Sequence, residues 1–556
     1  MILSGPLLVP VPFGGKRALV SVLALAVSLG SPCALAQDGK FSIDWEVLDR
    51  FRLLSDPDDL AFLHSRIGEL VSEEGGRKPV QPLRGHHGRH DDALRPLATK
   101  WDASRSRYEP GFADAKSWRL RLSVAPQPPS GAECAWTVDG STWRTAPCTD
   151  FRPETALEKG TGVAVSVADR RGKALGSAAW HVNIKDHLIV VLGDSFASGE
   201  GYPDVTRREG VLPDPESGPR LESMPAQWWD QRCHRSLFSG PAMAAIRFSH
   251  SRPRESVTFM SYACSGADIG GSTIEGDGGV LSAFEGRETA AQMEIIQEKW
   301  PHWGFQPPAD PLPLPPQLDA AVSDLCAQER MEPSGECEAG IRQPDVVVLS
   351  VGGNDIGFGR IITKMMTSSC REQCVDAIVA ERIRALPARY DELARQIGQR
   401  LAPRQVLLME YPNPTRGEGG AYCDDRRFRR GTSPVGPWPI LEILAIGEAE
   451  YRLAFERAYR PLIDAGNEAV RRNSHANWVR LPRLAASSNE KGVCARKSWI
   501  TTTAAAQRRQ FSLPRVAGIG GDMVGGLPTG ALHPNFYGYF NYAVALEDYF
   551  RRRLGE

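Results

Sequence analysis

The spacing of apolar and polar positions changes along the chain. Between residues 101 and 185, apolar residues alternate with polar ones in short stretches, at 118–124, 162–168 and 178–184. Strict alternation is typical of half-buried strands, and turn dipeptides such as Asp139-Gly140 separate the stretches. The pattern predicts a small β-rich, sandwich-like domain over residues 101–185.

After residue 186 the spacing becomes that of an α/β protein. Continuous apolar runs of strand length lie at 188–192, 257–261, 346–351, 406–409 and 478–481. Longer helical stretches occur between some of them, as at 375–401 and 446–472. Fully apolar strands that alternate with helices predict a parallel sheet covered on both faces. Three irregular insertions, at 201–232, 270–318 and 413–440, are candidates for active-site walls.

The N-terminal third has a different organisation. Lys16 and Arg17 precede an apolar run at 18–30 and the small-residue triplet Ala34-Leu35-Ala36. This is the layout of a secretory signal peptide, so we expect residues 1–36 to be removed and the protein to be secreted or periplasmic. Residues 37–76 have helical spacing, and 77–100 read as a polar linker, so 37–100 is assigned to a helical segment and linker. No later segment is apolar enough to span a bilayer.

Composition adds few constraints. The chain of 556 residues is 42% hydrophobic and 24% charged with a net charge of −1, which is typical of a soluble globular protein and gives no sign of nucleic-acid binding. Ten cysteines follow residue 36, and an even number in an exported chain predicts up to five disulfides. Sequence leaves their connectivity open, but neighbouring cysteines suggest the pairs Cys134–Cys148, Cys233–Cys264, Cys326–Cys337, Cys370–Cys374 and Cys423–Cys494.

A metal site is the competing interpretation of some of these residues. Cys370 and Cys374 have the spacing of half a zinc site, and His86, His87 and His90 lie close together in the linker. Neither group has the further ligands that tetrahedral coordination requires. We therefore expect disulfides, and neither a metal nor an organic cofactor.

Four short motifs hold the candidate chemistry. Gly193-Asp194-Ser195 follows the first apolar run of the α/β region, and Cys264-Ser265-Gly266 follows the second. Gly353-Asn354-Asp355 follows the third, and Leu532-His533-Pro534 lies near the C-terminus. Because ligands bind at the carboxyl ends of parallel strands, we expect the first three motifs to meet at one edge of the sheet.

Taken together, these motifs resemble the four blocks of the SGNH, or GDSL-type, hydrolases, over residues 186–556. The resemblance implies a three-layer α/β/α domain with a flavodoxin-like five-stranded parallel sheet. It implies Ser195 as nucleophile and His533 as its base. It also implies an oxyanion hole made by the N–H groups of Ser195 and Gly266 and the side-chain amide of Asn354. Each residue type suits acyl transfer, which needs an activated hydroxyl and preorganised donors.

One position departs from the family pattern. The family often has an aspartate three residues before the histidine, where this chain has Gly530. We expect a Ser–His dyad in which the Gly530 carbonyl orients the imidazole, with Asp522 as a less favoured substitute. Asp194 and Asp355 are interpreted as carboxylates that organise their loops.

The residues around the second motif also resemble those of exported, disulfide-bearing esterases and lipases of this class. The resemblance implies that a Cys233–Cys264 bridge pins the oxyanion loop. His234, next to Cys233, either touches substrate or serves in packing.

The predicted activity is hydrolysis of carboxylic esters, of lipid or other acyl groups, through an acyl-enzyme. The competing hypothesis is a carbohydrate O-acetylesterase, favoured by export, by the β-rich domain and by Trp228-Trp229 as a possible sugar platform. A third is a non-catalytic exported glycan-binding protein on the same scaffold. Sequence leaves the oligomeric state open.

Overall fold

The structure is a computed structural model. It describes residues 40–74, 97–206, 208–212, 220–224, 226–270, 280–281, 314–326, 337, 340–359, 361, 365, 372–424, 446–481, 484–510, 523–524, 527–528 and 530–555. The expected signal peptide and most of the expected linker lie outside these residues. So do Cys370, Asp522 and the histidines of the linker.

A parallel sheet forms the centre of the larger part of the molecule. Its strand order is β14-β11-β15-β16-β17, and every neighbouring pair is parallel. β14 and β15 are buried along their whole length, as their continuous apolar sequences require. The five predicted strands are confirmed: β11 (Asp186–Gly193), β14 (Ser256–Ser261), β15 (Val346–Ser350), β16 (Val406–Leu408) and β17 (Trp478–Arg480).

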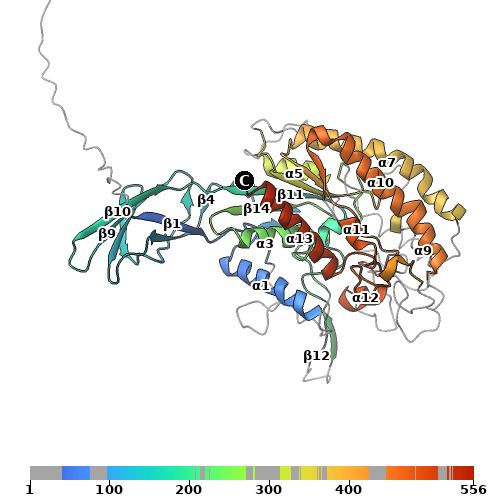
Figure 1. Cartoon of the computed structure of the whole chain (residues 1–556), viewed down its shortest axis with the longest axis horizontal. Helices are drawn as coiled ribbons and strands as arrows, with labels where there is room; N and C mark the ends of the chain where they lie inside the picture. The colour runs from blue at the N-terminus through green and yellow to red at the C-terminus, as the bar shows by residue number, and fades with distance from the viewer. Residues whose placement is uncertain are drawn as a thin grey trace, which may run out of the picture.

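Helices cover both faces of this sheet (Figure 1). The crossover from β11 to β14 runs in the opposite direction to the later crossovers, so right-handed connections place its helix on the opposite face. That helix, α3, packs against α13 and α1, whereas α5, α7 and α10 form the other layer. The bounds are α1 (Pro57–Glu74), α3 (Gly240–His250), α5 (Gln317–Leu325), α7 (Glu372–Arg400), α10 (Arg460–Arg472) and α13 (Phe536–Arg553). The predicted flavodoxin-like α/β/α architecture is therefore confirmed.

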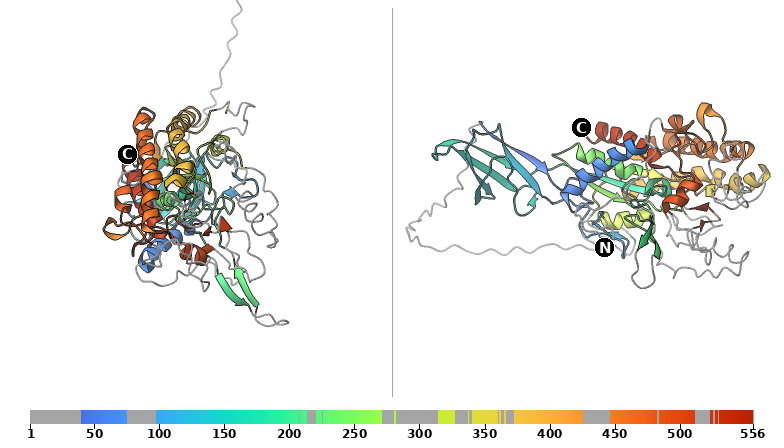
Figure 2. Two further views of the ribbon diagram at one scale, coloured as in Figure 1. Left: turned by 90° about the vertical axis from the view of Figure 1, so that its right-hand side faces the viewer. Right: turned by 90° about the horizontal axis from the view of Figure 1, so that it is seen from below.

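A second hydrophobic core lies in a β-rich region at one end of the molecule (Figures 1 and 2). It contains a four-stranded antiparallel sheet of order β10-β9-β6-β7 and the antiparallel pair β1–β5. Buried and less buried residues alternate along β5 and β9, which explains the alternating sequence. The strands are β1 (Ser42–Val47), β5 (Leu120–Ala125), β6 (Glu133–Val138), β7 (Ser141–Ala146), β9 (Gly162–Ala168) and β10 (Ala174–His181).

The N-terminal segment differs from its prediction. Residues 37–76 were expected to be helical, but β1 is a strand and helix α1 begins only at Pro57. Ile43 and Val47 of β1 are buried in the second core, where pairing with β5 satisfies the backbone. Conversely, Trp101 and nearby residues belong to the core of the α/β part, although the sequence assigned residue 101 to the β-rich domain.

Among the described residues, four of the five expected disulfides are seen. They join Cys134 to Cys148, Cys233 to Cys264, Cys326 to Cys337 and Cys423 to Cys494. The expected Cys370–Cys374 bridge involves a residue outside the described part of the chain. Pairing each cysteine with the next cysteine along the sequence was therefore correct wherever both cysteines are described.

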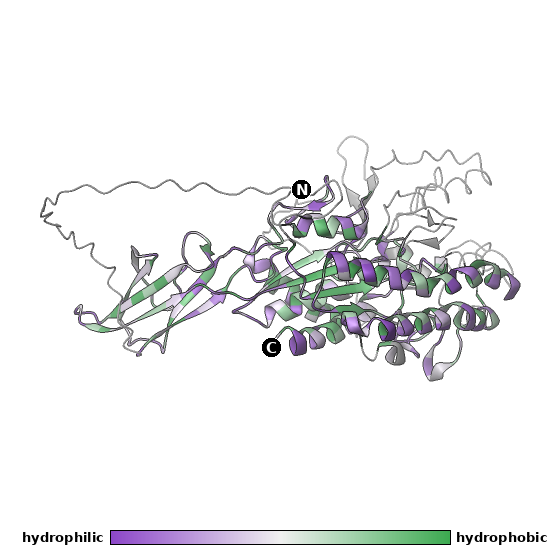
Figure 3. Ribbon diagram, turned by 90° about the horizontal axis from the view of Figure 1, so that it is seen from above, coloured by the Kyte–Doolittle hydropathy of each residue, from purple (hydrophilic) through white to green (hydrophobic). Residues whose placement is uncertain are grey.

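Short elements complete the described chain. They are β2 (Trp101–Asp102), β3 (Arg107–Tyr108), β4 (Ser117–Trp118), β8 (Leu157–Glu158), β12 (Arg208–Leu212), β13 (Arg220–Met224), β18 (Met523–Val524), β19 (Leu527–Pro528), α2 (Ser195–Ser198), α9 (Glu448–Ala454), α11 (Leu484–Ser488) and α12 (Thr503–Gln510). In Figure 3 the strands at the centre of the larger part are mainly hydrophobic, and the outer helices mix hydrophilic and hydrophobic residues. None of the described helices has the length and apolar character needed to cross a membrane.

Candidate active site

The candidate nucleophile lies on a tight turn at the carboxyl end of the central strand. β11 ends at Gly193, whose φ of 127° suits glycine, and a Cβ there would lie 2.0 Å from the Ser350 carbonyl oxygen. Asp194 then caps α2 by accepting a hydrogen bond from the Phe196 N–H at 3.1 Å. Ser195 is the first residue of α2, so its own N–H has no acceptor within the helix.

The side chain of Asp194 holds this turn in place through hydrogen bonds. Its carboxyl group accepts hydrogen bonds from Ser350 Oγ at 2.9 Å and from the Tyr411 hydroxyl. Burial raises the pKa of Asp194 to about 7, although the Tyr411 and Ser350 hydrogen bonds act to lower it. Asp355 is likewise buried, where it forms an ion pair of 3.0 Å with Arg389 and accepts the Ile269 N–H. Both carboxylates hold loops, as the sequence suggested.

His533 meets Ser195 across 338 residues of sequence. Its Nε2 lies 2.7 Å from Ser195 Oγ, and its Nδ1 lies 3.0 Å from the Ala531 carbonyl oxygen. A carbonyl can only accept, so Nδ1 carries the hydrogen and the unprotonated Nε2 accepts the Ser195 hydroxyl. This is the tautomer that a general base requires.

The carbonyl that orients the ring belongs to a different residue from the one expected. Gly530 was expected to provide it, but the Gly530 carbonyl accepts the backbone N–H of His533 at 3.3 Å. Leu532 adopts a left-handed φ of 65°, and this turns the Ala531 carbonyl back toward the imidazole. The orienting group is therefore one residue later in the chain.

Three candidate oxyanion donors come from loops after adjacent strands. Ser195 follows β11, Gly266 follows β14 and Asn354 follows β15. Gly266 has a φ of 84°, and the loop around it is tied to the central strand by the Cys264 N–H bond to the Gly193 carbonyl, at 2.9 Å. Asn354 donates one amide hydrogen to the Ala267 carbonyl at 2.8 Å, which leaves its second amide hydrogen for another acceptor.

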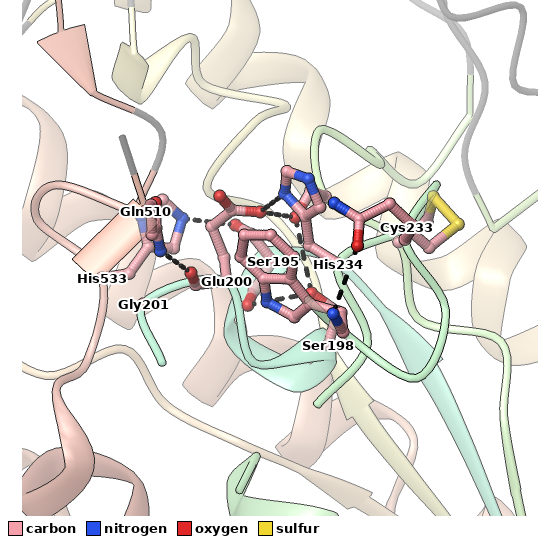
Figure 4. A network of polar contacts seen from close by, with 12 residues as sticks. Ser195, Ser198, Glu200, Gly201, Cys233, His234, Gln510 and His533 are labelled. Atoms are coloured by element: carbon pink, nitrogen blue, oxygen red, sulfur yellow. Dashed lines mark hydrogen bonds and ion pairs between the residues drawn. A yellow bond between two sulfur atoms is a disulfide. The ribbon is translucent and has the colours of Figure 1, made fainter. Parts of the chain in front are cut away.

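An acidic residue that was not predicted from the sequence lies at the candidate active site. Glu200 is only 2% exposed, and its Oε2 lies 2.5 Å from His234 Nδ1 and also accepts the Ser265 hydroxyl. Gln510 donates to the Glu200 backbone carbonyl at 2.5 Å. Figure 4 shows these side chains around Ser195 and His533. The only sign of Glu200 in the sequence was a charged residue between Gly199 and Gly201, a few residues after Ser195.

Burial and charge set the protonation of this group. Burial acts to raise the pKa of Glu200, but the charge and hydrogen bond of His234 outweigh it and hold the pKa at about 2. Burial lowers the pKa of His533, and the Glu200 charge partly opposes that effect. At neutral pH the site therefore contains a neutral His533 beside an ionised Glu200.

The tryptophans that suggested a sugar platform are packed. Trp228 is 8% exposed and stacks on His234 with ring centroids 4.0 Å apart. Trp229 is 7% exposed and meets Trp101 edge-on at 5.9 Å. Both rings are thus committed to contacts within the protein.

Comparison with known proteins gives only distant likenesses. No protein-family model and no curated protein matches the chain. An extracellular lipase from Streptomyces rimosus is 17% identical, with 65% of this chain and 99% of that one covered at a TM-score of 0.34. Phospholipase A1 from Streptomyces albidoflavus is 16% identical, with coverages of 65% and 98% and a TM-score of 0.32. A family two carbohydrate esterase from Clostridium thermocellum is 12% identical, with coverages of 76% and 87% and a TM-score of 0.25. Such low identities and TM-scores carry no inference about this chain.

Proposed function

We propose that the chain is a carboxylic ester hydrolase of the SGNH type, with Ser195 as nucleophile and His533 as general base. The observation that supports this most directly is the 2.7 Å contact between His533 Nε2 and Ser195 Oγ, with Nδ1 held by a backbone carbonyl. A hydroxyl that donates to a partly buried, neutral imidazole is the arrangement of an activated nucleophile.

The proposed reaction follows from the protonation states. Ser195 Oγ attacks the ester carbonyl while its proton passes to His533 Nε2. The oxyanion forms beside the Ser195 N–H, the Gly266 N–H and the Asn354 amide. His533 then protonates the leaving alcohol, which leaves an acyl-enzyme on Ser195. Water loses a proton to His533 and attacks the acyl group. The bond to Ser195 Oγ then breaks, His533 returns the proton to Ser195 Oγ, and the acid is released.

For the substrate we propose a lipid or another acyl ester, acted on outside the cytoplasm. Four disulfides support an oxidising location. The sugar-ester alternative loses one of its supports, because Trp228 and Trp229 are packed within the protein. Acyl-chain preference distinguishes the two alternatives directly.

The test is hydrolysis of p-nitrophenyl esters from acetate to palmitate by the full chain with its disulfides formed. Ser195→Ala should abolish turnover. Ser198→Ala is the matched control, since it removes a hydroxyl from the same short helix and should retain most of the activity. A long-chain optimum supports a lipid substrate, and loss beyond acetate supports a carbohydrate O-acetylesterase. Equal rates for the native and Ser195→Ala proteins, or no turnover of any ester, would overturn the proposal and favour the binding-protein alternative.

A further inference from the structure

We propose that Glu200 is a positioning residue that stabilises the imidazolium form of His533 through space, in place of the aspartate that this chain lacks. The inference rests on the proposed function of the Ser195–His533 pair.

Glu200 is built into the nucleophile turn. Its backbone N–H donates to the Ser195 carbonyl at 3.2 Å, directly after the left-handed Gly199 that ends α2. The next residue, Gly201, packs so closely that a Cβ there would lie 3.0 Å from the Cβ of His533. The chain around Glu200 is therefore in contact with both proposed members of the dyad.

The two oxygens of the Glu200 carboxyl group lie in different environments. Oε2 contacts His234 Nδ1 and the Ser265 hydroxyl. Oε1 is buried, and no hydrogen-bond donor reaches it among the described residues. In Figure 4 this second oxygen lies on the side of the carboxyl group toward His533. A buried carboxylate oxygen without a donor is costly, unless its negative charge acts on a nearby positive group.

The charges around His533 are few and of known sign. Glu200 raises the pKa of His533, and His234, which pairs with Glu200, lowers it. Tyr539 also faces this region and donates to the Ser195 carbonyl at 3.3 Å, and burial raises its pKa well above the ordinary value. Asp194, which precedes Ser195, has its own hydrogen bonds with Ser350 and Tyr411. Of these groups, only Glu200 is negative over the whole pH range in which an imidazole titrates.

The chemical role follows. When Ser195 Oγ bonds to the acyl carbon, its proton moves to His533 Nε2 and the ring becomes positive. Its Nδ1–H remains on the neutral Ala531 carbonyl, which offers less charge stabilisation than a carboxylate. Glu200 supplies the missing negative charge without receiving a proton. His234 and Ser265 keep its carboxyl group ionised and in place.

The test compares the native protein with Glu200→Gln, which keeps the size of the side chain and an acceptor for Ser265. Two quantities are measured against pH: the His533 pKa by histidine-selective ¹⁵N NMR, and the rate at which a fluorophosphonate labels Ser195. Without the Glu200 charge, the His533 pKa and the acid limb of labelling should move to lower pH by about one unit. Labelling at pH 8 should slow by about tenfold, the equivalent of that unit.

Glu200→Asp provides the matched control. It keeps a negative charge on the same backbone, so the His533 pKa should stay near its native value. A merely structural disturbance would slow labelling in both variants without lowering the His533 pKa in Glu200→Gln alone. An unchanged His533 pKa in Glu200→Gln overturns the inference about Glu200. Absence of Ser195 labelling in the native protein overturns the proposed function instead, and the NMR titration still decides the role of Glu200.

Discussion

The two hydrophobic cores of the molecule are built on different principles. In the β-rich region, buried and half-buried residues alternate along a strand, as they do along β5. In the α/β part, β14 and β15 are buried throughout, because helices cover both faces of the sheet. A strand of the first kind leaves every second side chain only half-buried. A strand of the second kind is buried on both faces, so residues near it can meet a substrate only where the strand ends.

Buried polar groups separate the two parts more sharply. Among the described side chains of residues 114–184, none that is polar or charged is buried. The carboxyl edge of the parallel sheet, by contrast, buries Asp194, Ser195 and Glu200 after β11 and Asp355 after the neighbouring strand β15. Buried polar groups are costly unless paired. Their presence at this edge is in line with the active site proposed there. Buried polar residues also lie toward the other end of the sheet, as Ser256 and Thr258 do.

Polar contacts join the two parts. Trp118 Nε1 donates to Ser256 Oγ at 2.9 Å, and Asp44 forms an ion pair of 2.6 Å with Arg254. The Val47 N–H donates to the Pro253 carbonyl at 2.8 Å. All three partners in the α/β part lie at or just before the start of β14, at the opposite end of that strand from the oxyanion loop. Changes within the β-rich core should therefore leave the site intact.

The strongest test of this separation is a matched pair of tryptophan deletions, one in each core. Trp136→Ala in β6 and Trp478→Ala in β17 both remove fully buried rings, and each should cost about 3–5 kcal/mol of unfolding free energy. Trp136→Ala should lower a spectroscopic melting transition and leave the thermal inactivation of ester turnover unchanged. Trp478→Ala should lower the inactivation temperature itself. If Trp136→Ala moves inactivation equally, the two cores unfold as one unit.

The oxyanion assignment gives the next largest effect. Asn354→Ala should lower kcat by about 10²–10³, because a donor to the developing negative oxygen is lost. Asn473→Ala is a matched control, since this buried side chain also donates to a backbone carbonyl, that of Ala469 at 2.9 Å, but lies at the end of α10. Steady-state kinetics should show the loss in kcat for Asn354→Ala alone. Equal losses in both variants would assign the effect to general destabilisation.

Removing disulfides should separate stability from activity. The serine double variant of Cys134 and Cys148 opens a loop with a sequence separation of 14 and should cost about 3 kcal/mol of stability without loss of turnover. The same change at Cys233 and Cys264 should also reduce turnover, because Cys264 lies two residues before Gly266. Urea unfolding and ester hydrolysis are measured for both. Full turnover without the Cys233–Cys264 bridge would show that this bridge is dispensable for the oxyanion loop.

The last prediction concerns the pH dependence of stability. The pKa of Asp194 is raised to about 7 in the folded protein, from a value of 3.8. Its contribution to stability is therefore fully present below about pH 3.8 and is lost as the pH rises through 7. Asp194→Asn cannot lose this proton, so urea midpoints between pH 5 and pH 8 should fall less than in the native protein. Parallel curves for the two proteins would contradict the raised pKa.

Much of the architecture was accessible from local pattern. Five apolar runs predicted the five strands of the parallel sheet, and alternation predicted β9 at the bounds that the structure has. Asp139-Gly140 predicted a turn, and both residues have the positive φ that a tight hairpin requires. Ser195 and His533 were singled out because the four motifs resemble the blocks of the SGNH hydrolases, and the structure places the two side chains in hydrogen-bond contact.

The sequence by itself thus determined what depends on period and spacing, namely the five strands of the parallel sheet and the alternating strands of the β-rich region. The order of the cysteines only suggested the disulfide pairs, and the dyad was implied by the resemblance of the motifs. Only the tertiary structure decided that β1 is a strand, since its partner β5 lies more than seventy residues away. It also decided that Ala531 orients His533 and that Glu200 lies between His234 and the dyad. These contacts depend on backbone turns and close packing, which produce no repeating pattern of residue types in the sequence.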